Sequence, residues 1–279
     1  MASVVLITGS SSGIGKALCQ EFSRRGCRVI ATARQLESIA DLKEQGMATW
    51  PLDVNQPEQV RQTVAEILAA EERLDILINN AGFGQFGPML DVSPEQMQAQ
   101  FETNVFAPLF LIQQVAPIMG RQGSGLIVNM GSISGVTSTP FAGAYCASKA
   151  ALHAYSDALR MELAPFGIRV VTIQPGGIES GFGEVAAENI RLGAESWYGA
   201  IADHIQARAT LSQQNATPTE EFAEKLVAAL LQPQPPAMIR LGKKSFRLPF
   251  LKRWLPTFLL DRILKKRFGL NELKEPQKP

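Results

Sequence analysis

Cysteine and histidine are scarce in this sequence. Its 279 residues include three cysteines without paired spacing, Cys19, Cys27 and Cys146, and two histidines, His153 and His204. Disulfide frameworks and zinc sites need more of these side chains at regular spacings. We therefore expect neither a disulfide framework nor a bound metal.

Targeting and disorder signals are also absent. The opening MASVVLITG has no charged region and no Ala-x-Ala cleavage site, so we expect no secretory signal and a cytoplasmic protein. Hydrophobic residues make up 46% of the sequence and charged residues 19%, which excludes a disordered or fibrous protein. Without repeats or a low-complexity linker, the length fits a single domain around one sheet.

Acidic residues dominate most of the chain but are almost missing near its end. Residues 1–239 carry 15 Lys and Arg against 23 Asp and Glu, whereas residues 240–268 carry 10 against 1. Because an acidic body repels phosphates, we expect no nucleic acid partner.

What the sequence does contain is a regular alternation of strand-like and helix-like segments. Short apolar, β-branched runs are followed by amphipathic stretches, which predicts an α/β fold: a Rossmann-type doubly wound parallel sheet in a single domain. The predicted strands are residues 3–8, 27–33, 48–54, 74–80, 125–131 and 168–174, and the main helices are 14–25, 57–71, 94–119 and 145–164. The residues that could bind a ligand or take part in catalysis follow the strand ends, where such sheets bind ligands.

The segment TGSSSGIG, residues 8–15, follows the first predicted strand and opens a helix. Glycines in this position permit a sharp turn and let the backbone approach a pyrophosphate, which the free N–H groups of the helix start attract. The predicted nucleotide-binding turn comprises Gly9, Ser10, Ser11, Ser12, Gly13, Ile14 and Gly15, with the three serines as hydroxyl donors.

The end of the second predicted strand indicates which nucleotide binds. Chains that bind NAD carry an acid there, whereas arginine accommodates the 2′-phosphate of NADP. Here Ala33 replaces the acid and Arg34 follows it, and an arginine can pair bidentately with a phosphate. The sequence therefore favours NADP(H).

Tyr145 and Lys149 lie one helical turn apart in AYCASKAAL, residues 144–152. An ammonium about 4 Å from the phenol would supply on the order of 4 kcal/mol, which lowers the tyrosine pKa by about three units from about 10. Such a phenol can exchange a proton with a carbonyl or an alcohol, and Ser132 can hold the same oxygen. Alone, the pair also fits mere helix packing, but together with the glycine turn it indicates carbonyl reduction.

These motifs, with NNAG (79–82), Asn104 in FETNVFAP and PGGIES (175–180), resemble the short-chain dehydrogenase/reductase superfamily over roughly residues 1–240. The resemblance implies that Tyr145 is the general acid/base, and that a proton relay runs from it through the cofactor ribose, Lys149 and a water near Asn104. Ser180 replaces the family's usual threonine and retains the hydroxyl. The resemblance also implies that Tyr145 and Lys149 contact the cofactor, with Lys149 at the ribose. The further cofactor contacts that it implies are Asp53, Val54, Asn80, Ala81, Gly82, Pro175, Gly176, Ile178 and Ser180.

Some of these residues have a structural alternative. Asn104 can be a kink residue within a helix, Asp53 can cap the next segment, and NNAG can be only a tight turn at a strand end.

The stretch STPFAGAYCASKAALHAYSDALRMEL is similar to the branch that contains hydroxysteroid and retinol dehydrogenases and acyl-dihydroxyacetone-phosphate reductases. This implies a hydrophobic substrate: a steroid, a retinoid, a long-chain aldehyde or an acyl ketone. We expect a catalytic domain over residues 1–242, with 181–215 as a substrate-binding loop. Aromatic residues near the strand ends fit an apolar pocket or ordinary core packing: Phe83, Phe86, Phe141 and Phe182.

Residues 243–279 form a basic amphipathic extension. Leu260, Ile263, Leu264 and Phe268 share one helical face, with Arg262, Lys265, Lys266 and Arg267 around it. No apolar run in the extension is long enough to span a bilayer. It can lie on the inner face of an anionic membrane as a peripheral anchor, or pack on the body or on a second subunit.

The resemblance implies a homodimer or homotetramer. Two other functions stay open: an NAD(P)-binding regulator or scaffold without turnover, and an NAD-linked dehydrogenase of small alcohols.

Overall fold

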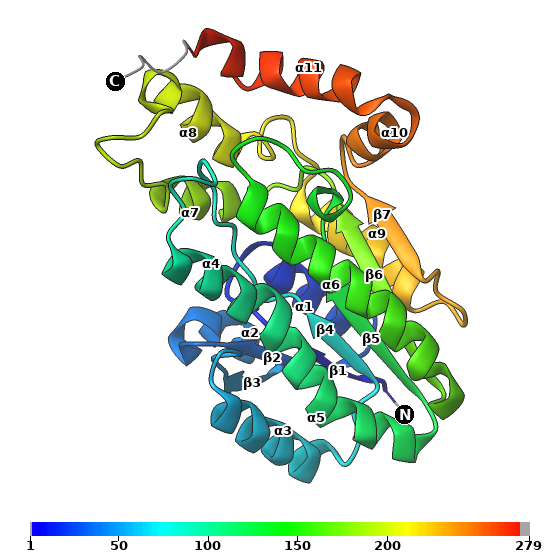
Figure 1. Ribbon diagram of the computed structural model, residues 1–279. Coiled ribbons are helices and arrows are strands. Elements are labelled where there is room, and N and C mark those ends of the chain that lie inside the picture. Colours follow the sequence, from blue (N-terminus) through cyan, green and yellow to red (C-terminus); the bar gives the residue numbers. More distant parts are fainter. Residues whose placement is uncertain (1, 274–279) are drawn as a thin grey trace.

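A parallel sheet of seven strands forms the centre of the protein (Figure 1). The computed structural model describes residues 2–273. The strands lie in the order β3-β2-β1-β4-β5-β6-β7, so the chain changes direction between β1 and β4, where doubly wound sheets open a ligand crevice. The predicted Rossmann-type fold is confirmed. The strands are β1 (Val4–Ile7), β2 (Arg28–Ala33), β3 (Ala48–Pro51), β4 (Ile76–Asn79), β5 (Gly125–Met130), β6 (Ile168–Pro175) and β7 (Met238–Leu241).

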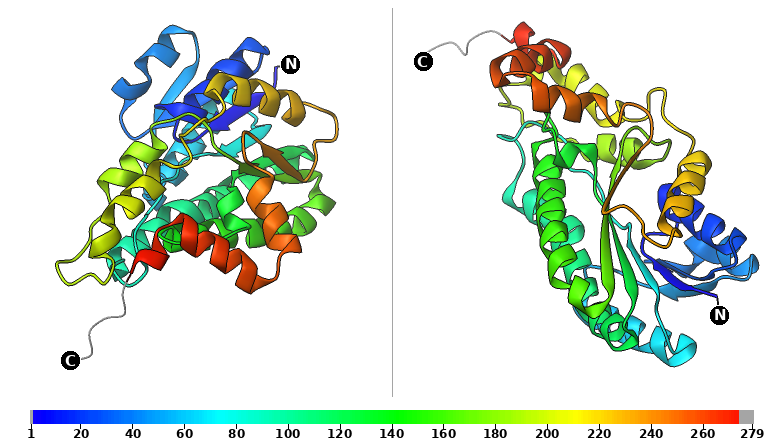
Figure 2. Two further views of the ribbon diagram at one scale, coloured as in Figure 1. Left: turned by 90° about the horizontal axis from the view of Figure 1, so that it is seen from above. Right: turned by 90° about the vertical axis from the view of Figure 1, so that its right-hand side faces the viewer.

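Helices cover both faces of the sheet, which is why its central strands are apolar throughout rather than alternating. Figure 2 shows the two layers of helices on either side. One face is covered by α1 (Gly13–Arg24), α2 (Ala40–Glu44) and α9 (Thr219–Leu230). The other is covered by α3 (Pro57–Glu71), α5 (Ala107–Gln122) and α6 (Gly143–Glu162).

Two elements differ from the prediction. β7 pairs in parallel with β6, but its four residues follow a proline-rich stretch and carry too little pattern to predict a strand. The long helix predicted over residues 94–119 is divided into α4 (Pro94–Phe101), a π-helical turn (Glu102–Phe106) and α5.

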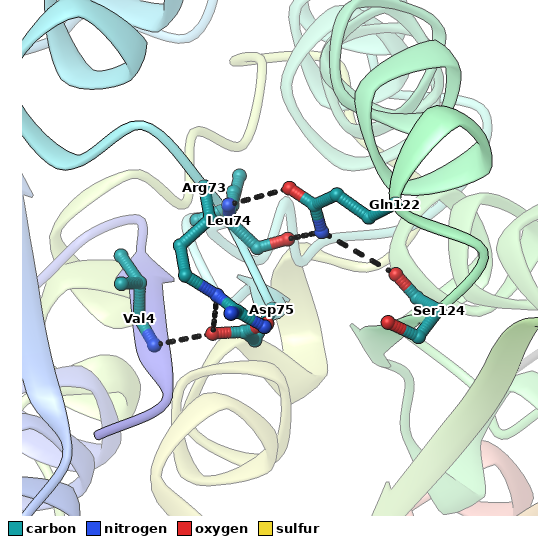
Figure 3. A network of polar contacts seen from close by, with 6 residues as sticks. All are labelled: Val4, Arg73, Leu74, Asp75, Gln122 and Ser124. Atoms are coloured by element: carbon teal, nitrogen blue, oxygen red, sulfur yellow. Dashed lines mark hydrogen bonds and ion pairs between the residues drawn. The ribbon is translucent and has the colours of Figure 1, made fainter. Parts of the chain in front are cut away.

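A polar network connects residues at the amino-terminal ends of the central strands, opposite the carboxyl ends (Figure 3). The Asp75 carboxylate accepts a hydrogen bond of 2.8 Å from the Val4 backbone N–H and pairs with Arg73. The Gln122 side chain accepts from the Leu74 N–H and donates to the Leu74 carbonyl, at 3.0 and 2.9 Å. These bonds join the starts of β1 and β4 to the end of α5, so the network serves the register of the sheet.

The C-terminal extension packs on the body of the protein. It forms α10 (Arg247–Trp254) and α11 (Thr257–Arg267), and α11 lies near α8 (Ala202–Thr210) in Figures 1 and 2. Leu260, Leu264 and Phe268 are buried in a cluster with Ile201 and Ile205. The predicted apolar face therefore covers the protein itself.

Ile263 departs from that prediction. It was expected on the same face, but 46% of its surface is exposed, because it lies beside the buried row rather than in it. Within residues 2–273, no helix combines the length and hydropathy that a bilayer crossing requires.

Candidate active site

A cavity of about 850 Å³ lies at the carboxyl ends of the strands. The loops after β1, β2, β4, β5 and β6 line one part of it, and residues from α7 (Phe182–Glu188), α8, α10 and α11 line the other. Most of the predicted site residues line this one cavity: Gly9, Ser11, Ser12, Gly13, Ile14, Gly15, Arg34, Asp53, Val54, Asn80, Ala81, Gly82, Ser132, Tyr145, Lys149, Pro175, Gly176, Ile178 and Ser180.

The glycine turn is shaped for a group that approaches the backbone closely. Gly9 has a φ of 69°, and a Cβ there would lie 2.9 Å from the Cα of Ala81. A Cβ on Gly15 would collide with the Gly9 carbonyl. The Asn80 amide donates to the carbonyls of Thr8 and Gly9 at 2.9 and 3.0 Å, which fixes the turn. The first residues of α1, Gly13 to Gly15, line the cavity, which is the position that a phosphate-binding helix start requires.

The position of Ser10 differs from the prediction for this turn. It was expected to offer its hydroxyl to a phosphate, but it is completely buried and does not line the cavity. Its hydroxyl donates to the Ile7 carbonyl at 3.0 Å. Ser11 and Ser12 line the cavity, so two of the three predicted serines lie where a ligand could reach them.

Arg34 lies in the cavity wall next to the small side chain of Ala33, with the Asp53 carboxylate in the same wall. Among the residues that the structure describes, no carboxylate forms an ion pair with Arg34. The exposed guanidinium is thus available to an anion at the nucleotide end of the cavity.

Asn104 lies one layer behind the cavity. It is buried in the π-helical turn between α4 and α5, and its side chain is paired with the backbone of Phe83 in both directions, at 3.2 and 3.0 Å. Its amide also donates to the Ser148 hydroxyl at 3.2 Å. Ser148 in turn donates to the Tyr145 carbonyl. Asn104 thereby joins the loop after β4 to the helix that carries Tyr145, and the π turn directs it there.

Tyr145 lies among aromatic rings in the wall of the cavity. Phe86 stacks on it with ring centroids 5.7 Å apart, and the Phe182 ring lies at 5.5 Å. Of the aromatic residues predicted to form the pocket, Phe83, Phe86 and Phe182 line it, but Phe141 packs against the C-terminal extension instead.

The protonation of Tyr145 differs from the sequence argument. Burial raises its pKa to about 12, and hydrogen bonding by Ser132 and the charge of Arg208 oppose this only in part. The Lys149 Nζ lies 5.9 Å from the Tyr145 ring centroid and donates to the Met130 carbonyl at 2.7 Å, and burial lowers the Lys149 pKa to about 8. The predicted lowering of the Tyr145 pKa is therefore wrong, because desolvation of the phenolate outweighs the neighbouring charges.

His153 supports Ser132 and was not identified as a site residue from the sequence. The Ser132 backbone N–H donates to its Nε2 at 3.3 Å, so this nitrogen must carry no proton. Burial, with the charge of Lys149, lowers the His153 pKa to about 4. The only signal in the sequence is its position four residues after Lys149, on the same side of the helix.

We expect acid to destabilise the protein through His153. The unfolded chain takes up a proton near pH 6.5 and the folded chain near 4, so stability falls as the pH drops through this window, by about 3 kcal/mol in total. The measurement is urea unfolding at several pH values between 7 and 4. His153→Gln, which does not titrate, should remove about this much of the pH dependence. His204→Gln, at a half-buried histidine of α8 outside the cavity wall, is the matched control. An unchanged slope in His153→Gln would contradict the assignment.

Arg208 in α8 was also missed from the sequence. It lines the cavity and is only 8% exposed, although arginine is rarely buried without a carboxylate partner. Nothing in its sequence context distinguishes it from a surface arginine of an amphipathic helix.

Comparisons with known proteins agree with this arrangement. The sequence profile described as short chain dehydrogenase matches residues 3–190. The chain is 36% identical over 266 residues to the uncharacterized oxidoreductase YbbO of Escherichia coli, with 95% of each chain covered. It is 31% identical to the NADPH-dependent 1-acyldihydroxyacetone phosphate reductase of Saccharomyces cerevisiae, with 99% of this chain and 95% of the yeast protein covered.

Solved structures give the same result. A short-chain dehydrogenase from Streptomyces avermitilis matches with a TM-score of 0.80 and 30% identity, over 98% of this chain and 97% of the other. A serine dehydrogenase in complex with NADP+ matches with a TM-score of 0.75 and 26% identity, over 86% and 94%. With the glycine turn, Ser132, Tyr145 and Lys149 in one cavity, the chain belongs to the short-chain dehydrogenase/reductase family of oxidoreductases.

Proposed function

We propose that this protein is an NADP(H)-dependent reductase that converts the carbonyl group of a hydrophobic substrate to an alcohol, with Tyr145 as the proton donor. The observation that carries the proposal is the phenol of Tyr145, which is buried in the wall of the same cavity as the glycine turn. A phenol whose pKa is about 12 holds its proton at neutral pH and can donate it. This state suits reduction, in which the carbonyl oxygen must gain a proton.

Residues at one end of the cavity fit NADP(H). The turn from Gly9 to Gly15 would hold the pyrophosphate, and Arg34 would pair with the 2′-phosphate, since no acid stands at Ala33. The NADPH dependence of the yeast relative and the NADP+ bound in the serine dehydrogenase support this assignment. When bound, the reduced cofactor supplies the hydride that reduces the carbonyl carbon.

The residues of the chain handle the oxygen and its proton. Ser132 would donate a hydrogen bond to the carbonyl oxygen, while the Tyr145 phenol transfers its proton to the same oxygen. Lys149 and Arg208 would stabilise the phenolate that this step leaves, because both cations lie close to Tyr145 and away from bulk water. Asn104 would act as a positioning residue through its bonds to Phe83 and Ser148.

The walls of the cavity favour an apolar substrate. Around Tyr145 they consist mainly of aromatic and aliphatic side chains, and the C-terminal extension adds more of them: Leu248, Leu251, Ile263, Leu264 and Phe268. A small polar alcohol would leave most of this surface without contact. We therefore place the substrate among long-chain or ring-containing carbonyl compounds.

The test is NADPH oxidation with the purified full chain and a graded set of carbonyl compounds. The set runs from short aldehydes through retinal and steroid ketones to acyl ketones. The expected result is turnover of a bulky compound, with a preference for NADPH over NADH. Tight NADPH binding without turnover of any compound would favour the alternative of a regulator or scaffold.

We further propose that the C-terminal extension attaches the protein to an anionic membrane surface. Although one face of α10 and α11 packs on the body, another carries aromatic rings that are more than 60% exposed: Phe246, Phe250, Trp254 and Phe258. Exposed Lys252, Arg253, Lys265 and Lys266 belong to the same two helices. Aromatic side chains among basic ones are typical of a helix that lies in the membrane interface. The same helices wall the cavity, so a lipophilic substrate could enter from the membrane.

Point substitutions test this attachment better than truncation, because removal of α11 would also expose the buried cluster around Phe268. We expect the triple variant Phe250→Ser, Trp254→Ser, Phe258→Ser to lose at least about tenfold in affinity for vesicles, since each ring contributes about 1.5–3 kcal/mol when fully buried. The measurement is cosedimentation with vesicles that contain anionic lipid. Phe166→Ser, at an aromatic ring that is 59% exposed outside the extension, is the matched control. Undiminished binding of the triple variant would refute the attachment.

A further inference from the structure

The substrate end of the cavity is positively charged as well as apolar. Arg208, Lys244, Arg247 and Arg267 line it, and Asp53, at the nucleotide end, is the only carboxylate residue in the lining of the whole cavity among residues 2–273. Of these four cations, Arg208 is buried and fixed in place, and the other three lie toward the surface.

Arg208 is held next to the reacting group. Its Nε and Nη2 both donate to the Thr139 hydroxyl, at 3.1 and 2.8 Å. The guanidinium carbon lies 5.0 Å from the centroid of the Phe86 ring, which stacks on Tyr145, and 5.7 Å from that of Phe268 in the C-terminal extension. Two helices and two loops thus fix one cation at the side of Tyr145.

The positive charge of Arg208 has no negatively charged partner among the residues that the structure describes. Within that part of the chain, its Nη1 also has no hydrogen-bond partner. Burial lowers the Arg208 pKa, and Arg267 adds to this, yet a guanidinium keeps its charge in proteins. A buried cation without a counterion is costly, and the Thr139 hydroxyl and the faces of Phe86 and Phe268 offset only part of this cost. An anionic group on a ligand would supply the missing counterion.

We propose that Arg208 binds an anionic group of the substrate, a phosphate monoester or a carboxylate on an apolar chain, in the cavity that holds Tyr145. This inference rests on the proposed function in taking the cavity as the substrate site, and it narrows the substrate to amphiphilic anions. Arg267 and Lys244 at the mouth would attract such an anion, and Phe268 and Leu264 would contact its chain.

The test measures binding, so that it does not depend on turnover. Decyl phosphate, undecanoate and the neutral decanol are titrated by calorimetry into the full-length protein saturated with NADPH. We expect at least one of the two anions to bind at least tenfold more tightly than decanol, and the comparison between them shows whether the site prefers phosphate or carboxylate. Equal affinities for decanol and both anions would overturn the proposal without any variant.

The variants then assign the effect to Arg208. Arg208→Gln should weaken anion binding by about 10- to 150-fold, the range for a lost hydrogen bond to a charged group, and change decanol binding little. Arg208→Lys should retain part of the preference, and unchanged NADPH affinity shows that both variants are folded. Arg191→Gln makes the same chemical change at an exposed arginine in the 181–215 segment, outside the cavity wall. Anion affinity in Arg208→Gln equal to that of the unmodified protein would overturn the proposal.

The two proposals can fail separately. If no carbonyl compound is reduced but anion binding depends on Arg208, the reductase function fails and the anion site stands. If decyl aldehyde is reduced while the anions show no preference, the reductase function stands and the anion site fails.

Discussion

Tyr145→Phe is expected to lower kcat for carbonyl reduction by about 10²- to 10⁴-fold, the usual contribution of a general acid. The substitution removes one hydroxyl and keeps the ring between Phe86 and Phe182. NADPH affinity should therefore change little. The readouts are NADPH oxidation under saturating substrate and fluorescence titration of NADPH.

Tyr155→Phe is the matched control for this experiment. Tyr155 lies on the same helix, but its hydroxyl donates to the Val105 carbonyl at 3.3 Å, outside the cavity. Loss of that bond should cost stability of about 1 kcal/mol and leave kcat unchanged. If Tyr145→Phe keeps more than a tenth of the activity, another group donates the proton and the proposed mechanism is wrong.

Arg34→Asp should weaken NADPH binding by about 100-fold or more, because it removes charge-assisted bonds to the 2′-phosphate and adds a like charge. NADH lacks that phosphate, and its ribose hydroxyl can bond to the new carboxylate. NADH affinity should therefore stay the same or improve. Titration of both cofactors into the variant measures the change in preference.

Arg121→Asp provides the comparison, since Arg121 is exposed at the end of α5 and does not line the cavity. It makes the same change in net charge and should leave both affinities as they are. A variant at position 34 that still prefers NADPH would show that other residues, such as Ser11 and Ser12, carry the selection.

The protonation state of Tyr145 depends on its burial more than on its spacing from Lys149. Spacing alone places an ammonium near the phenol and predicts an easily ionised tyrosine. Desolvation by the surrounding rings reverses this, since the phenol is protonated at neutral pH and Lys149 loses part of its charge near pH 8. The aromatic residues that make this environment come from distant segments, since Phe86 lies 59 residues before Tyr145 and Phe182 lies 37 residues after it.

The sequence by itself determined the features that depend on neighbouring residues. Apolar runs between amphipathic stretches predicted the parallel sheet, and Gly9 to Gly15 predicted the turn after β1, because strand burial and turn geometry are local. Ser132, Tyr145 and Lys149 could be identified together because they are close in the chain, in the loop after β5 and in α6, the helix that follows it.

Only the tertiary structure decided which side chains point into the cavity. It turned Ser10 inward, placed Asn104 behind the loop of Phe83, and put Phe141 under the C-terminal extension. It also brought Arg208, from a segment with little pattern, against Phe86 and near Tyr145, with Phe268 on its other side. The contacts of Arg208 join residues 60 or more positions apart. Which of them form depends on how whole helices pack, a property that no local spacing contains.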